Sequence, residues 1–351
     1  MKIGIPKEIK PWEGRVALIP AAAAELVSVG HHVMLQQGAG EASGFSDETY
    51  LAQGVDILPD AESVYGEAEL LLKVKEPLAS EVPMLSKEQR LFCYLHLAAN
   101  PVLTQQLCDV GLTAIAFETV AENRSLPLLV PMSDIAGRIS VQVGTHLLHR
   151  TGSHGKGVLL GGLPGVDRGR VVILGAGHAG TSAATVAAAL GAQVTVFDLS
   201  PERLSAMHHL GPNVTALAST ADAIDSAVRE ADLLIGSVLI PGAAAPKLVS
   251  AEQVAAMQPG SVVADIAVDQ GGCIATSRPT TYDAPYYVES DVIHFCVANM
   301  PGAVPKTSSQ ALSAALVPYL KRLVRDDWRE DAALVAGINV EAGKVVHPAL
   351  I

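Results

Sequence analysis

Short aliphatic runs alternate with helical patterns along most of the chain. In the first third, apolar runs predict strands at 2–5, 32–36, 70–74 and 91–95, and helical spacing predicts helices over 20–29 and 47–53. The rhythm returns with strands at 171–174, 194–197, 214–217, 233–237 and 261–266, separated by helices over 181–190, 201–210 and 221–230. Strands that alternate with helices form a mostly parallel sheet covered on both faces. The pattern therefore predicts an α/β protein with two Rossmann-like, doubly wound parallel-sheet domains.

Two longer helical patterns, at 132–150 and 307–325, flank the second group of strands. They suggest that one domain is inserted into the other and that the end of the chain packs on its beginning. We expect residues 1–131 and 301–351 to form one domain and residues 132–300 the other. The tail after residue 325 is polar and mixed, and it predicts only a short helix near 330–336.

The composition supports a globular chain and narrows its partners. Of 351 residues, 49% are hydrophobic and 17% charged, which excludes a disordered chain. Aromatic residues supply only 4%, so aliphatic side chains must fill the cores. The formal net charge of -12 would repel a polyanion, and we expect no nucleic-acid partner. A small anionic ligand would need local positive groups.

Targeting, membrane and metal signals are weak. The N-terminus carries charges at once and has no apolar core of a signal peptide. The stretch 171–197 has no formal charge and could span a bilayer by length, but its glycines and Gln193 indicate a strand, a turn, a helix and a strand. The cysteines at 93, 108, 273 and 296 show no CxxC spacing. We expect no membrane segment, no metal site and a reducing, cytoplasmic location.

A dinucleotide-binding fingerprint follows the strand at 171–174. The motif GAGHAG at 175–180 is preceded by that strand and followed by an alanine-rich helix. Gly175 permits a tight turn, Gly177 lets the backbone approach a pyrophosphate, and Gly180 allows close helix–strand packing. The helix N-terminus favours the phosphate charge. The domain over 132–300 is therefore predicted to bind a dinucleotide.

Asp198 follows the motif by about 20 residues, at the end of the next strand, as the fingerprint requires. Its carboxylate would accept hydrogen bonds from a ribose diol and repel a 2′-phosphate, which favours NAD over NADP. Arg203 lies nearby and could accommodate that phosphate, so it counts mildly against NAD. Asp198 could instead cap the helix at 201, although Ser200 is better placed to do so. We expect His178 to be an exposed residue of the first helical turn.

Hydride transfer needs substrate groups in the other domain, and three polar residues there stand out. Arg15 follows the first strand, Lys75 ends a strand and His96 ends another. The carboxyl ends of strands in an open parallel sheet face the ligand crevice. His96 taken alone would more commonly be a core histidine, but its place beside Lys75 on equivalent strand ends favours chemistry.

At these residues the sequence resembles the L-alanine dehydrogenase family, which shares ancestry with the nucleotide-binding subunit of proton-translocating transhydrogenase. The likeness runs over nearly the whole chain. The matching segments are IGIPKEIK, RVALIP, GAGEASGFSDETY, LLLKVKEPL, YLHLAAN, PLLVPMSDIAGR, GVLLGGLPGV, VLIPGAAAPKLV, DIAVDQGGC and VANMPGAVPKTSSQAL. This chain ends sooner than many relatives, and Cys93 stands where a small hydroxyl residue is usual.

The resemblance implies a role for each candidate residue. Arg15 and Lys75 would bind the substrate, His96 would be the acid/base and Asp269 the second catalytic residue. A guanidinium suits a carboxylate, and the ordinary pKa of histidine suits proton transfer near neutral pH. The resemblance also implies an NAD site lined by Ser133, Gly175, Gly177, Gly180, Asp198, Arg203, Ser219, Val238, Leu239, Ile266, Ala267, Val268, Asp269, Arg278, Val297, Ala298, Asn299 and Met300. Without it, Asn299 and Met300 read equally well as a helix start before Pro301.

The expected activity is reversible, NAD-dependent oxidative deamination of L-alanine to pyruvate and ammonium, in a homo-oligomer that the resemblance suggests is a hexamer. One alternative is a dehydrogenase for another small 2-amino acid, or for the glyoxylate/glycine pair. Another is a transhydrogenase-like nucleotide-binding subunit, which predicts that the substrate groups are missing.

Overall fold

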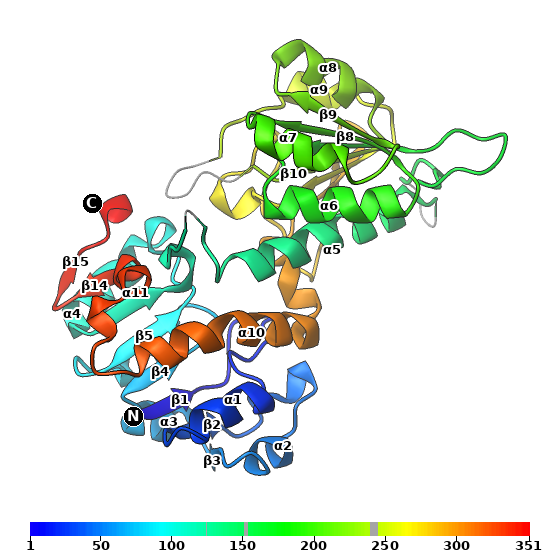
Figure 1. The fold of residues 1–351 in the computed structure, drawn as a ribbon. Coiled ribbons are helices and arrows are strands. Elements are labelled where there is room, and N and C mark those ends of the chain that lie inside the picture. The colour runs from blue at the N-terminus through cyan, green and yellow to red at the C-terminus, as the bar shows by residue number, and fades with distance from the viewer. Residues whose placement is uncertain (124, 151–153, 239–244) are drawn as a thin grey trace. The chain divides into compact units, whose positions relative to one another are not determined.

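The computed structural model describes residues 1–123, 125–150, 154–238 and 245–351, which form two compact units. Unit 1 comprises Met1–Met132 and Val304–Ile351, and unit 2 comprises Ser133–Ala303. Unit 2 is inserted into the sequence of unit 1 (Figure 1). The domain boundaries expected from the sequence lie within three residues of these limits.

The sheet of unit 1 has eight strands in the order β15-β14-β6-β5-β4-β1-β2-β3. Their bounds are β1 Lys2–Ile5, β2 His32–Gln36, β3 Asp56–Leu58, β4 Leu70–Leu72, β5 Arg90–Cys93, β6 Thr113–Ala116, β14 Ile338–Glu341 and β15 Lys344–Val345. The first six strands are parallel. Numbered along the chain, these strands lie across the sheet in the order 3-2-1-4-5-6, which is the doubly wound arrangement. The switch point of this arrangement lies between β1 and β4.

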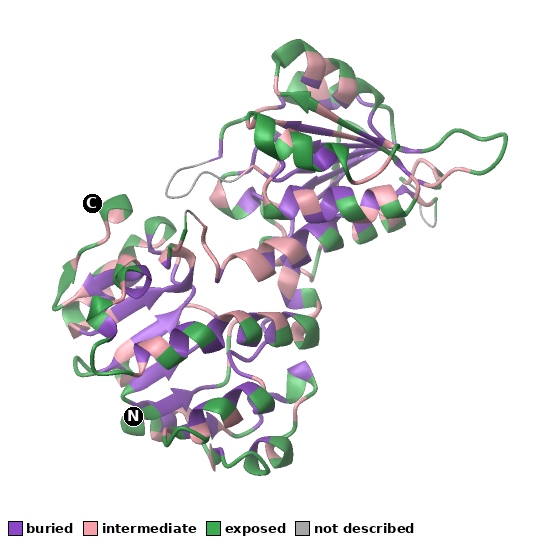
Figure 2. Ribbon diagram, viewed as in Figure 1, coloured by how far each residue is buried: buried purple, intermediate pink, exposed green. Residues whose placement is uncertain are grey.

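Helices cover both faces of this sheet. They are α1 Pro20–Val27, α2 Asp47–Leu51, α3 Ala61–Glu67, α4 Pro101–Val110, α10 Pro305–Leu323 and α11 Ala332–Ala336. One core joins α3 and α4 to strand residues that include Leu71, Leu91 and Cys93. Helices α1 and α10 contact each other and lie in front of the sheet in Figure 1. The inner strands of the sheet are almost wholly buried, whereas the edge strands β3 and β15 are exposed or half-buried (Figure 2).

The end of the chain completes the sheet of unit 1, which the sequence prediction missed. We expected a short helix near 330–336 and no further element. The helix is present as α11, but β14 then pairs antiparallel with β6, and β15 pairs with β14. The strands are short and mix polar with apolar residues, so their stability comes from pairing with β6 rather than from local pattern.

Unit 2 repeats the doubly wound arrangement, in the order β12-β13-β11-β10-β7-β8-β9. The bounds are β7 Arg170–Leu174, β8 Gln193–Asp198, β9 Val214–Ala218, β10 Leu233–Gly236, β11 Val262–Asp265, β12 Tyr286–Glu289 and β13 Val292–Phe295. All pairs are parallel except β12 with β13. The parallel strands again read 3-2-1-4-5-6, with the switch point between β7 and β10.

The helices of unit 2 are α5 Val130–Leu148, which begins in the last residues of unit 1, α6 His178–Ala189, α7 Pro201–His208, α8 Ala221–Glu230 and α9 Ala251–Ala255. The uncharged stretch 171–197 is β7, α6 and most of β8, as the sequence predicted. Across the described residues, no helix is long and apolar enough to cross a membrane.

The two longest helices begin two residues earlier than predicted. Helix α5 starts at Val130 with Pro131 in its first turn, and α10 starts at Pro305. Proline fits the first turn of a helix because its fixed φ is already helical and its missing N–H would have no partner there. The predicted starts at 132 and 307 treated these prolines as preceding the helix.

Candidate active site

The predicted substrate residues of unit 1 gather around the switch point between β1 and β4. Arg15 belongs to the loop that follows β1, and Lys75 lies three residues beyond the end of β4. His96 lies three residues beyond the end of β5, the strand next to β4. In a doubly wound sheet the loops at such a point diverge and leave a crevice for a ligand.

Arg15 is 2% exposed and is held by Glu13 in a two-point ion pair. Its Nε donates to Glu13 Oε1 at 2.6 Å and its Nη2 to Oε2 at 2.5 Å. Burial would raise the pKa of the Glu13 carboxyl, but the hydrogen bonds from Arg15 outweigh it and hold that pKa below its usual value. On the other side, Nη1 lies 3.1 Å from Met132 Sδ. Thioether sulfur is a weak acceptor, so a carboxylate ligand would be a stronger partner for Nη1.

Serine hydroxyls from other elements fix the Arg15 loop. Ser309 and Ser313 of α10 accept from the N–H groups of Val16 and Ile19, each at 2.9 Å. Ser43 donates to the carbonyl of Gly14 at 2.7 Å. All three serines are buried, and the two on α10 are four residues apart, on one face of the helix. The end of the chain thereby holds the loop that carries Arg15.

Lys73 and Lys75, two residues apart, have opposite environments. Lys73 is fully buried between two carboxylates, which raise the pKa of its ammonium against the effect of burial. Lys75 is half-buried, and burial together with the positive charge of Arg15 lowers the pKa of its amine. Lys75 therefore lies in a locally positive region that an anionic ligand would neutralise.

His96 adopts a left-handed backbone conformation, with φ of 48°. This conformation is unfavourable for a residue with a β-carbon, and such strain is often found at functional sites. Glu118 supports it by accepting from the N–H of His96 at 2.6 Å and from that of Leu95 at 3.1 Å. The Nδ1 atom of His96 lies 4.0 Å from the same carboxylate, and the ring stacks on Tyr94. The carboxylate thus holds the backbone of His96 and lies near its ring.

The glycine motif of unit 2 lies at the switch point between β7 and β10. Gly175 has a φ of +99°, and a β-carbon there would lie 3.1 Å from Val238. A β-carbon on Gly180 would lie 1.8 Å from the carbonyl oxygen of Gly175, which is the close packing expected of the third glycine. A β-carbon on Gly177 would meet nothing within 4 Å. The open space over Gly177, at the N-terminus of α6, fits a dinucleotide pyrophosphate.

Asp198 ends β8 and faces this motif. Its Oδ2 accepts from the N–H of Ala176 at 2.6 Å and lies 3.7 Å from Nη1 of Arg203. Helix α7 is capped by Ser200, which accepts from the N–H of Arg203, so Asp198 does not serve as that cap. His178 is exposed in the first turn of α6, as expected.

The remaining predicted cofactor residues follow other strands of unit 2 or precede its first strand. Ser133 is on α5, and Ser219 follows β9, its N–H bonded to the carbonyl of Asp198 at 3.2 Å. Val238 follows β10 and lies against Gly175. Leu239 is outside the described residues.

The loop after β11 carries Ile266, Ala267, Val268 and Asp269. Asp269 is exposed on a 3-10 turn, Val268–Gln270. Asp265, at the end of β11, is fully buried and accepts from the N–H groups of Ala267 and Ile274, each at 3.1 Å. Burial raises the pKa of the Asp265 carboxyl. Asp265 thus closes the loop that presents Asp269.

Arg278 and residues 297–300 form the last predicted part. The Arg278 guanidinium lies 4.1 Å above the ring of Tyr287. Val297 and Met300 are buried, whereas Ala298 is exposed. Met300 begins a 3-10 helix, Met300–Ala303, that precedes α10, which agrees with the helix-start interpretation of this segment.

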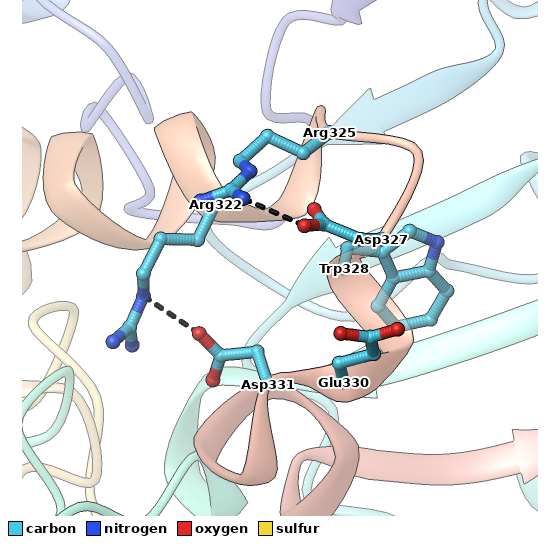
Figure 3. A pocket seen from close by; sticks show the side chains of 6 residues that line it. All are labelled: Arg322, Arg325, Asp327, Trp328, Glu330 and Asp331. Carbon is cyan, nitrogen blue, oxygen red and sulfur yellow. Dashed lines mark hydrogen bonds and ion pairs between the residues drawn. The ribbon is translucent and has the colours of Figure 1, made fainter.

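A surface pocket of about 200 Å³ lies elsewhere, around Trp328 (Figure 3). Its cations are already paired, Arg325 with Asp327 at 2.6 Å and Arg322 with Asp331 at 3.1 Å. It contains none of the predicted site residues. Within the described parts of the chain, no cluster of three or more His, Cys, Asp or Glu residues could hold a metal ion.

Comparison with known families accounts for both units. The model "Alanine dehydrogenase/PNT, N-terminal domain" matches residues 4–136, and "Alanine dehydrogenase/PNT, C-terminal domain" matches residues 140–348. The chain belongs to the alanine dehydrogenase/PNT family. Alanine dehydrogenase from Halomonas elongata is 50% identical over 357 residues, covering 100% of this chain and 96% of that protein.

Solved structures agree with this family. A structure of L-alanine dehydrogenase superposes with a TM-score of 0.95 at 51% identity, covering 100% of this chain and 98% of that one. A transhydrogenase from Sinorhizobium meliloti superposes with a TM-score of 0.85 at 26% identity, covering 99% of this chain and 100% of that one. The fold class and family expected from the sequence are confirmed.

Several residues that shape the site of this alanine dehydrogenase/PNT chain escaped the sequence analysis. Glu13 and Glu118 hold Arg15 and His96, and Asp265 closes the Asp269 loop. Their partners are distant in sequence or belong to irregular loops, so no period or motif marks them. The one available signal was Glu13, a carboxylate two positions before Arg15.

Proposed function

We propose that the chain is an L-alanine dehydrogenase that converts L-alanine, water and NAD⁺ reversibly to pyruvate, ammonium, NADH and a proton. The observation that carries this proposal is that Arg15, Lys75 and His96 follow β1, β4 and β5 at the carboxyl edge of one sheet, in a chain whose other unit has a dinucleotide motif at its switch point. Full-length identity of about half to alanine dehydrogenases supports it.

NAD is the proposed cofactor because Asp198 lies at the tip of the second strand of unit 2 and faces the glycine motif. A carboxylate there can accept hydrogen bonds from a ribose diol and repels a 2′-phosphate. Arg203, the residue that could favour NADP, is ion-paired with Asp198. Ser219, Val238, Leu239, Arg278 and the segments 266–269 and 297–300 are proposed to line the rest of this site. Bound NAD⁺ supplies the hydride acceptor.

The substrate carboxylate is proposed to bind Arg15 and Lys75. The guanidinium offers donors in a fixed geometry and the ammonium adds charge close to the developing carbonyl oxygen. Since Arg15 is held by Glu13 and its loop by three serines, the site is arranged before the substrate arrives. This preorganisation lowers the cost of orienting a small molecule.

His96 is proposed as the acid/base. Once hydride loss leaves an imine carbon, water adds to it, and His96 accepts the proton that the water gives up. His96 then returns this proton to the amine nitrogen and takes up the proton of the new hydroxyl group, so that the C–N bond breaks, ammonia leaves and the carbonyl forms. Asp269 is proposed to orient the amine. Glu118 holds His96 in its strained conformation while this occurs.

The direct test is alanine-dependent formation of NADH by the purified protein at alkaline pH. We expect an absorbance increase that requires both alanine and NAD⁺. No NADH formation by a folded protein that binds NADH would refute the proposal.

A substrate panel decides between alanine and other small amino acids. One methylene changes specificity by only about 1–3 kcal/mol, so neighbouring substrates should differ in kcat/KM by roughly 10- to 200-fold. We expect kcat/KM to be higher for pyruvate than for glyoxylate or 2-oxobutyrate. A transhydrogenase-like nucleotide-binding subunit would instead show no keto-acid activity.

Two further properties are part of the proposal. We infer a homo-oligomer, expected to be a hexamer from the family, which light scattering would test. A cytoplasmic location is supported by four cysteines that are free thiols, three of them buried.

A further inference from the structure

Glu8 and Glu81 flank the buried ammonium of Lys73 beneath the substrate residues. Lys73 Nζ lies 2.7 Å from Glu81 Oε1 and 3.3 Å from Glu8 Oε2. The lysine side chain is 0% exposed and each carboxylate 4%. Desolvating three charges costs free energy that their attraction only partly returns, so such a cluster is poor evidence for a role in stability alone. The hydrogen bonds of the two carboxylates to backbone N–H groups indicate a second role.

Glu8 spans the switch point of unit 1. It belongs to the loop after β1, yet its second oxygen accepts from the backbone of the segment after β4. Oε1 receives the N–H of Val74 at 2.6 Å and the N–H of Lys75 at 3.4 Å. A hydrogen bond from an amide to a carboxylate is about twice as strong as one between neutral groups. The backbone from which the Lys75 side chain emerges is therefore fixed by Glu8.

Glu81 shares the same ammonium but holds a different segment. Its Oε1 accepts from the hydroxyl of Tyr65 at 2.8 Å, and its Oε2 accepts from the N–H of Leu78 at 2.8 Å. The two carboxylates are thus equally buried and both paired with Lys73, Glu81 at the shorter distance, and they differ in the backbone that they hold. This difference makes Glu81 a matched control for Glu8.

We propose that Glu8 is a positioning residue for substrate binding, which places the Lys75 ammonium by bonding the backbone N–H groups of Val74 and Lys75. This inference rests on the proposed function, because it assigns Lys75 to the carboxylate end of a small 2-keto acid. Lysine has a long flexible side chain, so the point at which it leaves the backbone decides where its charge can rest. A displacement of about 1 Å in such a group can cost a hundredfold in rate.

The test compares Glu8→Gln with Glu81→Gln in the full chain. Each variant removes one carboxylate from Lys73, so both should lower the melting temperature. The probe is oxamate, an unreactive analogue of pyruvate, titrated by calorimetry into the NADH-saturated protein. We expect Glu8→Gln to raise the oxamate Kd about tenfold, because a neutral amide oxygen holds the two N–H groups more weakly than a carboxylate does, and Glu81→Gln to leave it within about twofold.

A further variant, Glu8→Asp, separates the charge of the side chain from its length. Glu8→Asp keeps a carboxylate near Lys73 but is one methylene shorter, so it should lose the bond to Val74. We expect it to raise the oxamate Kd while keeping more of the thermal stability than Glu8→Gln does. In all three variants the NADH Kd should stay at the wild-type value, since Glu8 and Glu81 lie in unit 1 and the glycine motif lies in unit 2.

Equal oxamate affinities in Glu8→Gln and Glu81→Gln would overturn the inference, whether both were weak or both were normal. The proposed function fails separately, since it is decided by turnover of the wild type. A wild type that binds oxamate but does not turn over would contradict the function, and the variants would still decide the role of Glu8. A wild type that turns over alanine but does not bind oxamate would overturn the inference and leave the proposed function standing.

Discussion

Lys73 and Lys75 are close in sequence, but their neighbouring charges give them different roles. Lys73 lies between two carboxylates and serves as an internal counter-ion. Lys75 lies near Arg15 and has a lowered pKa, so its ammonium is the less stable of the two in the ligand-free protein. A bound carboxylate would reverse that imbalance, because it favours the charged form.

The lowered pKa of Lys75 predicts the pH dependence of substrate binding. The ammonium form binds the anion, so affinity should fall as the pH rises through a pKa below the ordinary 10.5. Above that pKa, each pH unit should weaken oxamate binding up to about tenfold. Titrating oxamate into the NADH complex from neutral to alkaline pH measures this.

Lys75→Arg is the control for this pH dependence. The guanidinium of this variant stays charged throughout the pH range. The oxamate affinity that the variant retains should therefore not fall as the pH rises through the pKa of Lys75 in the wild type. The same fall in the arginine variant would show that another group is responsible.

Replacing His96 by alanine should abolish proton transfer while sparing the cofactor site. We expect kcat to fall by about 10²–10⁴, the usual contribution of a general acid/base. The NADH Kd, measured by fluorescence titration, should stay at the wild-type value. A variant with near-normal kcat would remove His96 from the mechanism.

Asp198 should control the choice of cofactor. In Asp198→Asn the amide oxygen can still accept from Ala176, but the charge that repels a 2′-phosphate is gone. Arg203 also loses its ion-pair partner. We expect NADPH affinity to rise at least about tenfold, given the cost of juxtaposed like charges. Parallel titrations with NADH and NADPH would show this, and an unchanged ratio would argue against a role for Asp198 at the ribose.

At the scale of elements, two glycines of one motif should respond differently to alanine. A β-carbon at Gly180 would collide with the carbonyl of Gly175, so Gly180→Ala should destabilise unit 2 by about 3 kcal/mol and weaken NADH binding. Gly177→Ala meets nothing within 4 Å and should melt like the wild type, yet lose NADH affinity because its methyl group occupies the space proposed for the pyrophosphate. Thermal melts and NADH titrations of both variants check this pair.

Elements with strong local patterns were predictable from the sequence. The strands of unit 2 from β7 to β11 were predicted within one residue at each end, because each is an aliphatic run between turns. The tail strands β14 and β15 were missed, since they depend on pairing with β6. Helix α10 was predicted, but the two serines that hold the Arg15 loop gave no sign of that role.

The site residues also divide into those that local sequence predicts and those that depend on distant parts of the chain. Gly175, Gly177, Gly180 and Asp198 were found by spacing, because consecutive elements of one βαβ unit bring them together. Arg15, Lys75 and His96 follow three different strands, and only the pairing order of the sheet makes those strands neighbours or near neighbours. Their assignment needed the family resemblance, and supports such as Glu118 needed the structure.

At the scale of the whole molecule, two units with the same strand order carry different loops at their switch points. Unit 1 has cations and a histidine there, and unit 2 has glycines and a carboxylate. The overall charge of -12 would repel a polyanion, but Arg15 and Lys75 make one local exception that suits a small acid. The division of labour between substrate and cofactor thus lies in the loops and not in the fold.

The most direct test of this account is the absorbance of NADH in the presence of pyruvate and ammonium, run beside NADPH. We predict a loss of NADH absorbance that requires both pyruvate and ammonium and yields one L-alanine for each NADH oxidised, with NADPH consumed far more slowly. A folded protein that binds NADH but leaves its absorbance unchanged with both substrates would contradict the account.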